Sequence, residues 1–148
     1  MRPIGLLVLS SVLLTPPCIA SSVDDKPVDA VAISALATKA SLASPKEQCF
    51  LYAELVHRMT ELAGHQIKDG QDASATLRGI REYTQKIHLG VAKDTKRLKN
   101  AQILMEHTAF RLNEYLHSAA IDDRPVLEST LKNLNQVQDE LMLQVFRH

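Results

Sequence analysis

Residues 73–120 read ASATLRGIREYTQKIHLGVAKDTKRLKNAQILMEHTAFRLNEYLHSAA, and this stretch decides the fold. Two sets of mostly apolar residues recur in it at intervals of seven, three places apart, as in helices packed lengthwise. The first set is Leu77, Thr84, Val91, Leu98, Met105, Leu112 and Ala119, and the second is Ile80, Ile87, Asp94, Ala101, Thr108 and Tyr115. No proline interrupts the stretch, so it predicts one helix of about 48 residues, roughly 70 Å long.

A shorter helix is expected on each side of this long one. Residues 44–47 (Ser-Pro-Lys-Glu) have the form of a capping box, and the amphipathic stretch after them ends at Gly70, a left-handed helix stop. Residues 122–125 (Asp-Asp-Arg-Pro) form a turn, after which helical spacing continues to about Phe146. The predicted class is all-α: antiparallel helical hairpins, in which each flanking helix folds back on a different half of the central helix.

The middle of the long stretch leaves a second architecture open. Gly90 is a poor helix former, and Asp94 places a charge at a position of the apolar seam, which is costly if the seam is dry. A break near Gly90 would convert the chain into a compact four-helix bundle. The continuous helix is the prediction, and the broken helix is the alternative.

The first twenty residues have the form of an export signal. Arg2 gives a positive start, residues 4–14 form an apolar run, and small residues precede a cleavage point after Ala20. The expected divisions are a signal peptide at 1–20, a mobile arm or marginal helix at 21–43, and a single helical domain at 44–148. Cleavage would leave Cys49 alone in an exported (periplasmic or secreted) protein, either buried or in an intermolecular disulfide.

Two Glu-x-x-His pairs are the candidates for a metal site. They are Glu54 with His57 and Glu114 with His117, and the spacing is that of ligands in di-iron helical bundles. On helical wheels both pairs lie away from the apolar stripes, so we interpret them as solvated side chains and expect no metal or cofactor. Hydrolase, phosphate-loop and haem-attachment motifs do not occur in the sequence, which argues against an enzyme.

A second apolar stripe in the same stretch predicts a contact with another chain. Ile103, Leu104 and Phe110 lie off the main seam, and an apolar belt this wide needs more than one neighbouring helix. Either a four-helix core within one chain or a homodimer or other protein partner would supply that neighbour.

The charged residues give a weaker indication. Lys86, Lys93 and Arg97 are expected close together on an outer helix face, where they could hold an anionic membrane or an acidic partner. A solvated face is the plainer interpretation, and nucleic acid is not expected because no aromatic residues interleave with these charges. The functional hypothesis is therefore an exported helical protein for protein–protein interaction or scaffolding in the cell envelope. The alternative is a bundle that binds a small ligand or a metal.

Overall fold

The computed structural model describes residues 30–91 and 97–147. Five α-helices make up the described chain: α1 (Ala30–Leu42), α2 (Pro45–Lys68), α3 (Ser74–Gly90), α4 (Leu98–Ser118) and α5 (Arg124–Arg147). The all-α class is therefore confirmed. The predicted signal peptide lies outside the described residues. None of the described helices is both long and apolar enough to cross a membrane.

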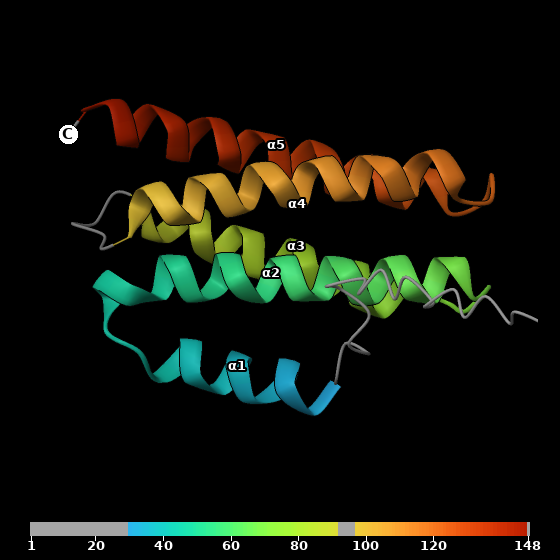
Figure 1. The fold of residues 1–148 in the computed structure, drawn as a ribbon, viewed down its shortest axis with the longest axis horizontal. Coiled ribbons are helices and arrows are strands. Elements are labelled where there is room, and N and C mark those ends of the chain that lie inside the picture. The colour runs from blue at the N-terminus through green and yellow to red at the C-terminus, as the bar shows by residue number, and fades with distance from the viewer. Residues whose placement is uncertain (1–29, 92–96, 148) are drawn as a thin grey trace, which may run out of the picture.

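Helices α2 to α5 form a four-helix bundle, with α1 packed on its outside (Figure 1). Both α2 and α5 contact α3 and α4, so α2 lies diagonally opposite α5 and α3 lies diagonally opposite α4. Short turns join the antiparallel hairpins α2–α3 and α4–α5. The connection from α3 to α4 crosses the diagonal, and as a result α2 runs parallel to its neighbour α4, and α3 runs parallel to α5.

The prediction of one continuous helix over residues 73–120 is wrong, and the alternative of a four-helix bundle with a break near Gly90 is confirmed. Helix α3 ends at Gly90 and α4 begins at Leu98, after Arg97 in a left-handed conformation with φ 59°. A continuous helix would leave each half covered by a single partner. Folding back at Gly90 instead turns four apolar faces toward one another and buries more apolar surface. Asp94 lies outside the described residues.

The seven-residue pattern nevertheless identifies the core on both sides of the break. Every described member of the two sets is buried except Leu98 and Tyr115, which are half-buried. The core also accepts threonine, because a buried hydroxyl can donate to the carbonyl oxygen four residues earlier in its own helix. One such threonine lies in each bundle helix: Thr60, Thr84, Thr108 and Thr130.

The helix ends follow the predicted positions, with one difference in their chemistry. Helix α2 begins after Ser44, but no side-chain cap forms there; the Ser44 hydroxyl donates to the Glu47 carboxylate at 3.3 Å instead. At the other end Gly70 has φ +67°, and its N–H donates to the Ile67 carbonyl at 3.1 Å, so the left-handed stop is confirmed. Asp72 accepts the Ser74 N–H at 2.8 Å and so satisfies a free amide at the start of α3.

Helix α1 covers the side of α2 that faces away from the bundle. Residues 30–42, for which the sequence left a mobile arm or a marginal helix open, form this helix, with Leu36 and Ala40 buried. The Gln48 side chain donates to the Ser41 carbonyl at 3.4 Å. The fully buried Leu55 lies seven residues beyond Gln48, so both share the face of α2 that α1 covers.

Candidate functional site

An open pocket of about 350 Å³ lies between the amino-terminal halves of α2 and α4. Phe50, Ile103 and Leu104 give it apolar walls, and the polar residues around it are Arg97, Asn100 and His107. The Arg97 guanidinium lies 3.5 Å from the centroid of the Phe50 ring, in a cation–π stack that joins the start of α4 to α2. The pocket therefore combines apolar surface with a cationic edge.

Polar contacts follow the pocket along the same pair of helices. The His57 Nδ1 atom lies 3.0 Å from the Thr108 hydroxyl oxygen, and the His57 and His107 rings lie 5.3 Å apart. Because the Thr108 hydroxyl donates to the Leu104 carbonyl at 2.7 Å, its oxygen accepts from His57, and the proton lies on Nδ1. These contacts fix His57 against α4.

Beyond His57, three side chains form a connected set that we call the α2–α4 clamp: Glu61, Arg111 and Tyr115. The Arg111 guanidinium donates through Nε and Nη2 to both Glu61 carboxylate oxygens, each at 3.0 Å. The Tyr115 hydroxyl donates to Glu61 at 2.8 Å and accepts from Arg111 at 2.7 Å. The Tyr115 ring lies directly against Gly64, where a Cβ atom would collide with it. The clamp therefore holds α4 at a single register on α2.

The protonation states of the clamp suit a structural contact. Burial alone would raise the pKa of Glu61, but hydrogen bonds from Arg111 and Tyr115 outweigh burial and lower the pKa below its ordinary value of 4.5. Burial, followed by the hydrogen bond to Glu61, raises the pKa of Tyr115 well above 10. Near neutral pH the clamp therefore contains a carboxylate, a guanidinium cation and a neutral phenol. Charge-assisted hydrogen bonds among these groups keep the three side chains together.

The four metal candidates do not come together as a ligand set. Glu54 pairs with Arg58 at 2.7 Å, Glu114 pairs with Arg111 at 2.8 Å, and His117 Nδ1 lies 2.7 Å from the Asn113 carbonyl. Within residues 30–91 and 97–147, no three His, Cys, Asp or Glu side chains group as metal ligands would.

The interpretation of His57 as a solvated side chain is wrong: it is half-buried in the α2–α4 contact. The helical wheel placed it away from the stripe of α2 that packs on α3. It could not reveal that α4 covers a second side of the same helix.

Cys49 is a buried free thiol. Burial raises its pKa to about 11, so it is protonated near neutral pH and has little of the nucleophilic thiolate form. Of the two alternatives that the sequence left for this cysteine, its position fits the buried one.

The residues expected in an interaction have separate locations. On α4, Ile103 and Phe110 are 52% and 61% exposed, while Leu104 is half-buried in the wall of the pocket. Lys86 lies on α3 over the Tyr52 and Tyr83 rings, at 5.4 and 5.1 Å from their centroids. Arg97, by contrast, directly precedes α4, so the two residues belong to different elements, and Lys93 is outside the described residues.

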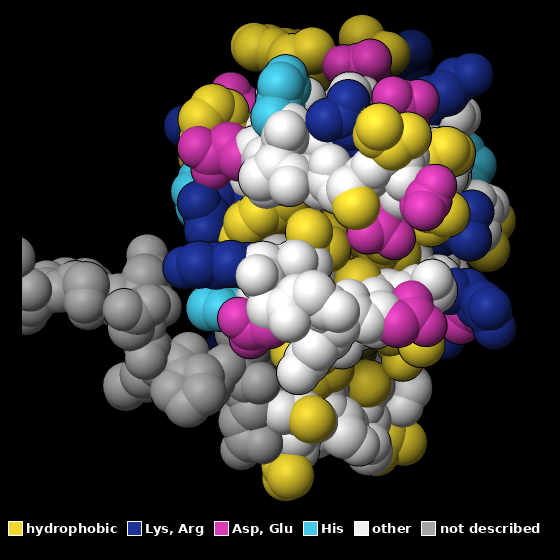
Figure 2. Space-filling model, turned by 90° about the vertical axis from the view of Figure 1, so that its right-hand side faces the viewer, with side chains coloured by type: hydrophobic (Ala, Val, Ile, Leu, Met, Phe, Trp, Pro, Cys, Tyr) yellow, Lys and Arg dark blue, Asp and Glu magenta, His cyan; other side chains and the backbone are white. Residues whose placement is uncertain are grey.

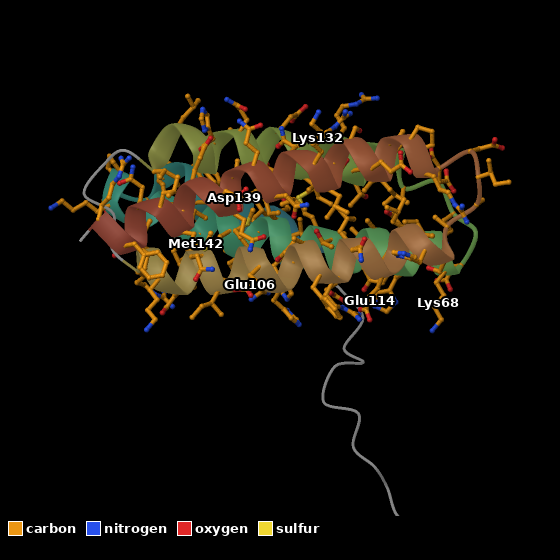
Figure 3. The ribbon with its side chains drawn as sticks, turned by 90° about the horizontal axis from the view of Figure 1, so that it is seen from above. Lys68, Glu106, Glu114, Lys132, Asp139 and Met142 are labelled. Carbon is orange, nitrogen blue, oxygen red and sulfur yellow. The ribbon has the colours of Figure 1, made fainter. Side chains whose placement is uncertain are left out.

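Figure 2 views the bundle from the end at which the α2–α3 and α4–α5 turns lie, and there positive and negative side chains are interspersed. Figure 3 shows Glu106 and Glu114 on the side of α4 that faces away from α5. Ile103 and Phe110 are exposed on the same helix, between and beside these carboxylates. The outward side of α4 thus combines large apolar side chains with charges.

Sequence reasoning missed Phe50 and the whole clamp. Glu61 and Arg111 are 50 residues apart, and no local pattern links them. The one available signal was Gly64 within a helix, which indicates a close approach by another group.

The comparisons with known proteins give no relative for this chain: no protein-family model matches it, and neither a curated protein nor a solved structure does.

Proposed function

We propose that this chain is an exported protein-interaction module that binds a protein partner through the outer face of α4 and the adjoining pocket. By the outer face of α4 we mean Lys99, Ile103, Glu106, His107, Phe110 and Glu114, all of which are exposed. The observation that carries the proposal is the exposure of Ile103 and Phe110, seven residues apart on the face of α4 opposite the core.

These two side chains are not needed for the core of the described bundle. The core side of α4 is occupied by Met105 and Leu112, both fully buried, with Ala101 and Thr108 between and beside them. Solvation of Ile103 and Phe110 costs free energy that burial against another protein would recover. Contact of this stripe with another protein would therefore be favourable.

The clamp supports this function by making the surface rigid. Glu61, Arg111 and Tyr115 fix α4 on α2 from one side of the pocket, and the stack of Arg97 on Phe50 fixes it from the other. A binding surface held in place before association loses less conformational entropy on binding. The pocket is thus suited to receive a side chain of a partner.

The exported location is part of the proposal and rests on the sequence of residues 1–20. In an envelope compartment the chain would act as a docking or scaffolding element. The amino-terminal sequence of protein recovered from its native cells tests this part, since cleavage after Ala20 predicts a chain that begins with Ser21.

A photo-crosslinking amino acid at position 110 tests the interaction directly in the cells that make the protein. The matched control carries the same group at position 132, because Lys132 is exposed on α5, away from the proposed surface (Figure 3). We expect protein adducts at position 110 and none above background at position 132. Equal labelling at the two positions, or no adduct at position 110, would overturn the proposal.

The pocket supports a second candidate function, the binding of a small amphipathic anion. Phe50, Ile103 and Leu104 could contact an apolar chain, and Arg97 and Asn100 could contact its carboxylate. Native mass spectrometry of purified protein with a medium-chain fatty acid tests this candidate. A one-to-one complex that is lost in the Arg97→Glu variant would favour it over a protein partner.

A further inference from the structure

The outer face of α4 has matching residues on the two sides of its midpoint. Counting outward in both directions from the point between Glu106 and His107, Ile103 occupies the same place as Phe110, and Lys99 the same place as Glu114. Ile103 thus corresponds to the apolar Phe110, and Lys99 corresponds to the oppositely charged Glu114. A surface of this kind is complementary to a second copy of itself turned end for end.

We propose that this chain forms a homodimer in which two α4 helices pack antiparallel, about a two-fold axis that passes between Glu106 and His107. The inference rests on the proposed interaction function and names its partner as a second copy of the chain. In a two-fold contact of this type each pair of residues occurs twice. The dimer would therefore contain two Ile103–Phe110 contacts and two Lys99–Glu114 contacts.

The pocket supplies the shape that such a dimer needs. Ile103 lines it, so the Phe110 side chain of the second copy would lie at its mouth and enter between Phe50 and His107. The same arrangement places Phe110 of the first copy at the pocket of the second. Each dimer would thus contain two contacts in which an exposed aromatic side chain fills an open apolar pocket. Buried aromatic side chains of this kind contribute much of the binding energy at protein interfaces.

The charges select the antiparallel direction. A parallel pairing of the two helices would place Lys99 against Lys99, Glu106 against Glu106 and Glu114 against Glu114. The antiparallel pairing instead opposes each Lys99 to a Glu114 and leaves the two Lys99 side chains, and likewise the two Glu114 side chains, about 22 Å apart along the helix axis. Glu114 remains available, because its side chain is 45% exposed even though it also contacts Arg111. Fifteen helical steps separate Lys99 from Glu114, so the contact would extend over about 22 Å of α4.

The first experiment measures self-association of the purified full chain by sedimentation equilibrium. We expect the natural sequence to dimerise with rising concentration. The Phe110→Glu variant should weaken association by about 100-fold or more, because each dimer loses two aromatic anchors. Its helical circular dichroism should be retained, since Phe110 is exposed. The control Lys132→Glu changes a charge on α5 and should leave association unchanged.

A charge exchange tests the same contact without removal of an apolar side chain. Lys99→Glu should weaken association severalfold, and the double variant Lys99→Glu/Glu114→Lys should recover most of the loss. Failure of the double variant to recover any association would contradict the pairing of Lys99 with Glu114.

Cysteine cross-linking tests the register, on a background in which Cys18 is replaced by serine and Cys49 by alanine. A chain with Ile103→Cys, mixed with a chain that carries Phe110→Cys, should form a disulfide-linked dimer on mild oxidation. Either chain alone should react more slowly, because like positions are offset by seven helical steps, about 10 Å along the axis. Faster linkage of 103 to 103 would overturn the antiparallel arrangement.

The experiments separate failure of this inference from failure of the proposed function. If the purified chain stays monomeric at every concentration while the photo-crosslinker at position 110 captures a different protein, the homodimer is wrong and the interaction function stands. An adduct with twice the mass of the chain supports both. No adduct and no dimer would overturn both.

Discussion

Within the four-helix bundle, α2 packs against α3 on one side and α4 on the other, and the two contacts are built differently. Toward α3, which runs antiparallel, the contact is apolar and aromatic: Tyr52 stacks on Tyr83 with ring centroids 5.8 Å apart, and Met59 lies against Gly79. Toward α4, which runs parallel, the contact contains the clamp and the Tyr115 ring seated on Gly64.

This difference follows from how each neighbour is connected. A short turn through Gly70 brings α3 directly alongside α2, so chain connectivity places it and apolar packing suffices. Helix α4 is about 50 residues from its partners in α2, and no turn fixes its register. Charged and hydrogen-bonded groups accept few alternative registers, since a shift would leave them buried without partners. Polar contacts thus fix the register of α4 on α2, which the chain connection does not fix.

The largest expected effect on stability comes from substitution of the glycine in each contact, Gly64 toward α4 and Gly79 on α3. Gly64→Ala should lower the free energy of unfolding by about 2–3 kcal/mol, because the new methyl group collides with the Tyr115 ring. Gly79→Ala meets only the flexible end of Met59 and should be neutral or raise stability by about 0.5 kcal/mol through helix propensity. Urea denaturation of both variants measures the contrast, and equal losses would show that the Tyr115 ring is free to move aside.

The next effect comes from breaking the clamp. Arg111→Met should cost about 2 kcal/mol, since it leaves the partly buried Glu61 carboxylate without its cation. The control Arg58→Met removes an exposed pair with Glu54, one turn apart on the same helix, and should cost only about 0.3 kcal/mol. A double-mutant cycle with Glu61→Gln measures the coupling directly. Coupling near zero would mean that the clamp does not hold α4 in register.

The pH dependence of stability should reflect the same carboxylate. The folded state lowers the pKa of Glu61, so its contribution is present well above pH 4.5 and is lost as pH falls through the lowered value. The natural chain should therefore lose stability in acid more steeply than the Glu61→Gln variant. Thermal melts between about pH 7 and pH 3 compare the two, and parallel curves would contradict the lowered pKa.

The smallest expected loss of stability comes from a substitution at the contact between α2 and α3. Lys86→Met removes a cation from above the Tyr52 and Tyr83 rings and should cost about 0.5 kcal/mol, because the ammonium is partly solvated. Thermal denaturation in low and high salt would show the loss mainly in low salt. A loss as large as that of Arg111→Met would remove the distinction between the two contacts.

The sequence was enough to predict the helical class, the core residues and most helix ends. The seven-residue sets from Leu77 to Ala119 predicted burial correctly because periodicity depends on which way a side chain points. They could not decide between one long helix and two. The connection from Gly90 to Leu98 keeps the spacing of seven, so the pattern continues in phase across the break. The broken helix is favoured because it buries more apolar surface, and that gain depends on packing between helices that are distant in the sequence.

The candidate site was predictable only in part. The stripe of Ile103 and Phe110 was visible in the sequence as apolar residues off the seam, and both are exposed on α4. The pocket beside them was not, because it needs Phe50 from α2 and the stack of Arg97 on its ring. Contacts between residues about 50 positions apart have no local signature in a single sequence.

The diagonal connection between α3 and α4 also has a consequence for the order of folding. Contacts within a hairpin join near neighbours in the chain, such as Thr76 and Gln66, ten residues apart, and they close small loops. Contacts between the hairpins, such as His57 with Thr108 and His88 with Glu140, span 51 and 52 residues. The two hairpins should therefore form early, and the slow step should be their collision and docking face to face.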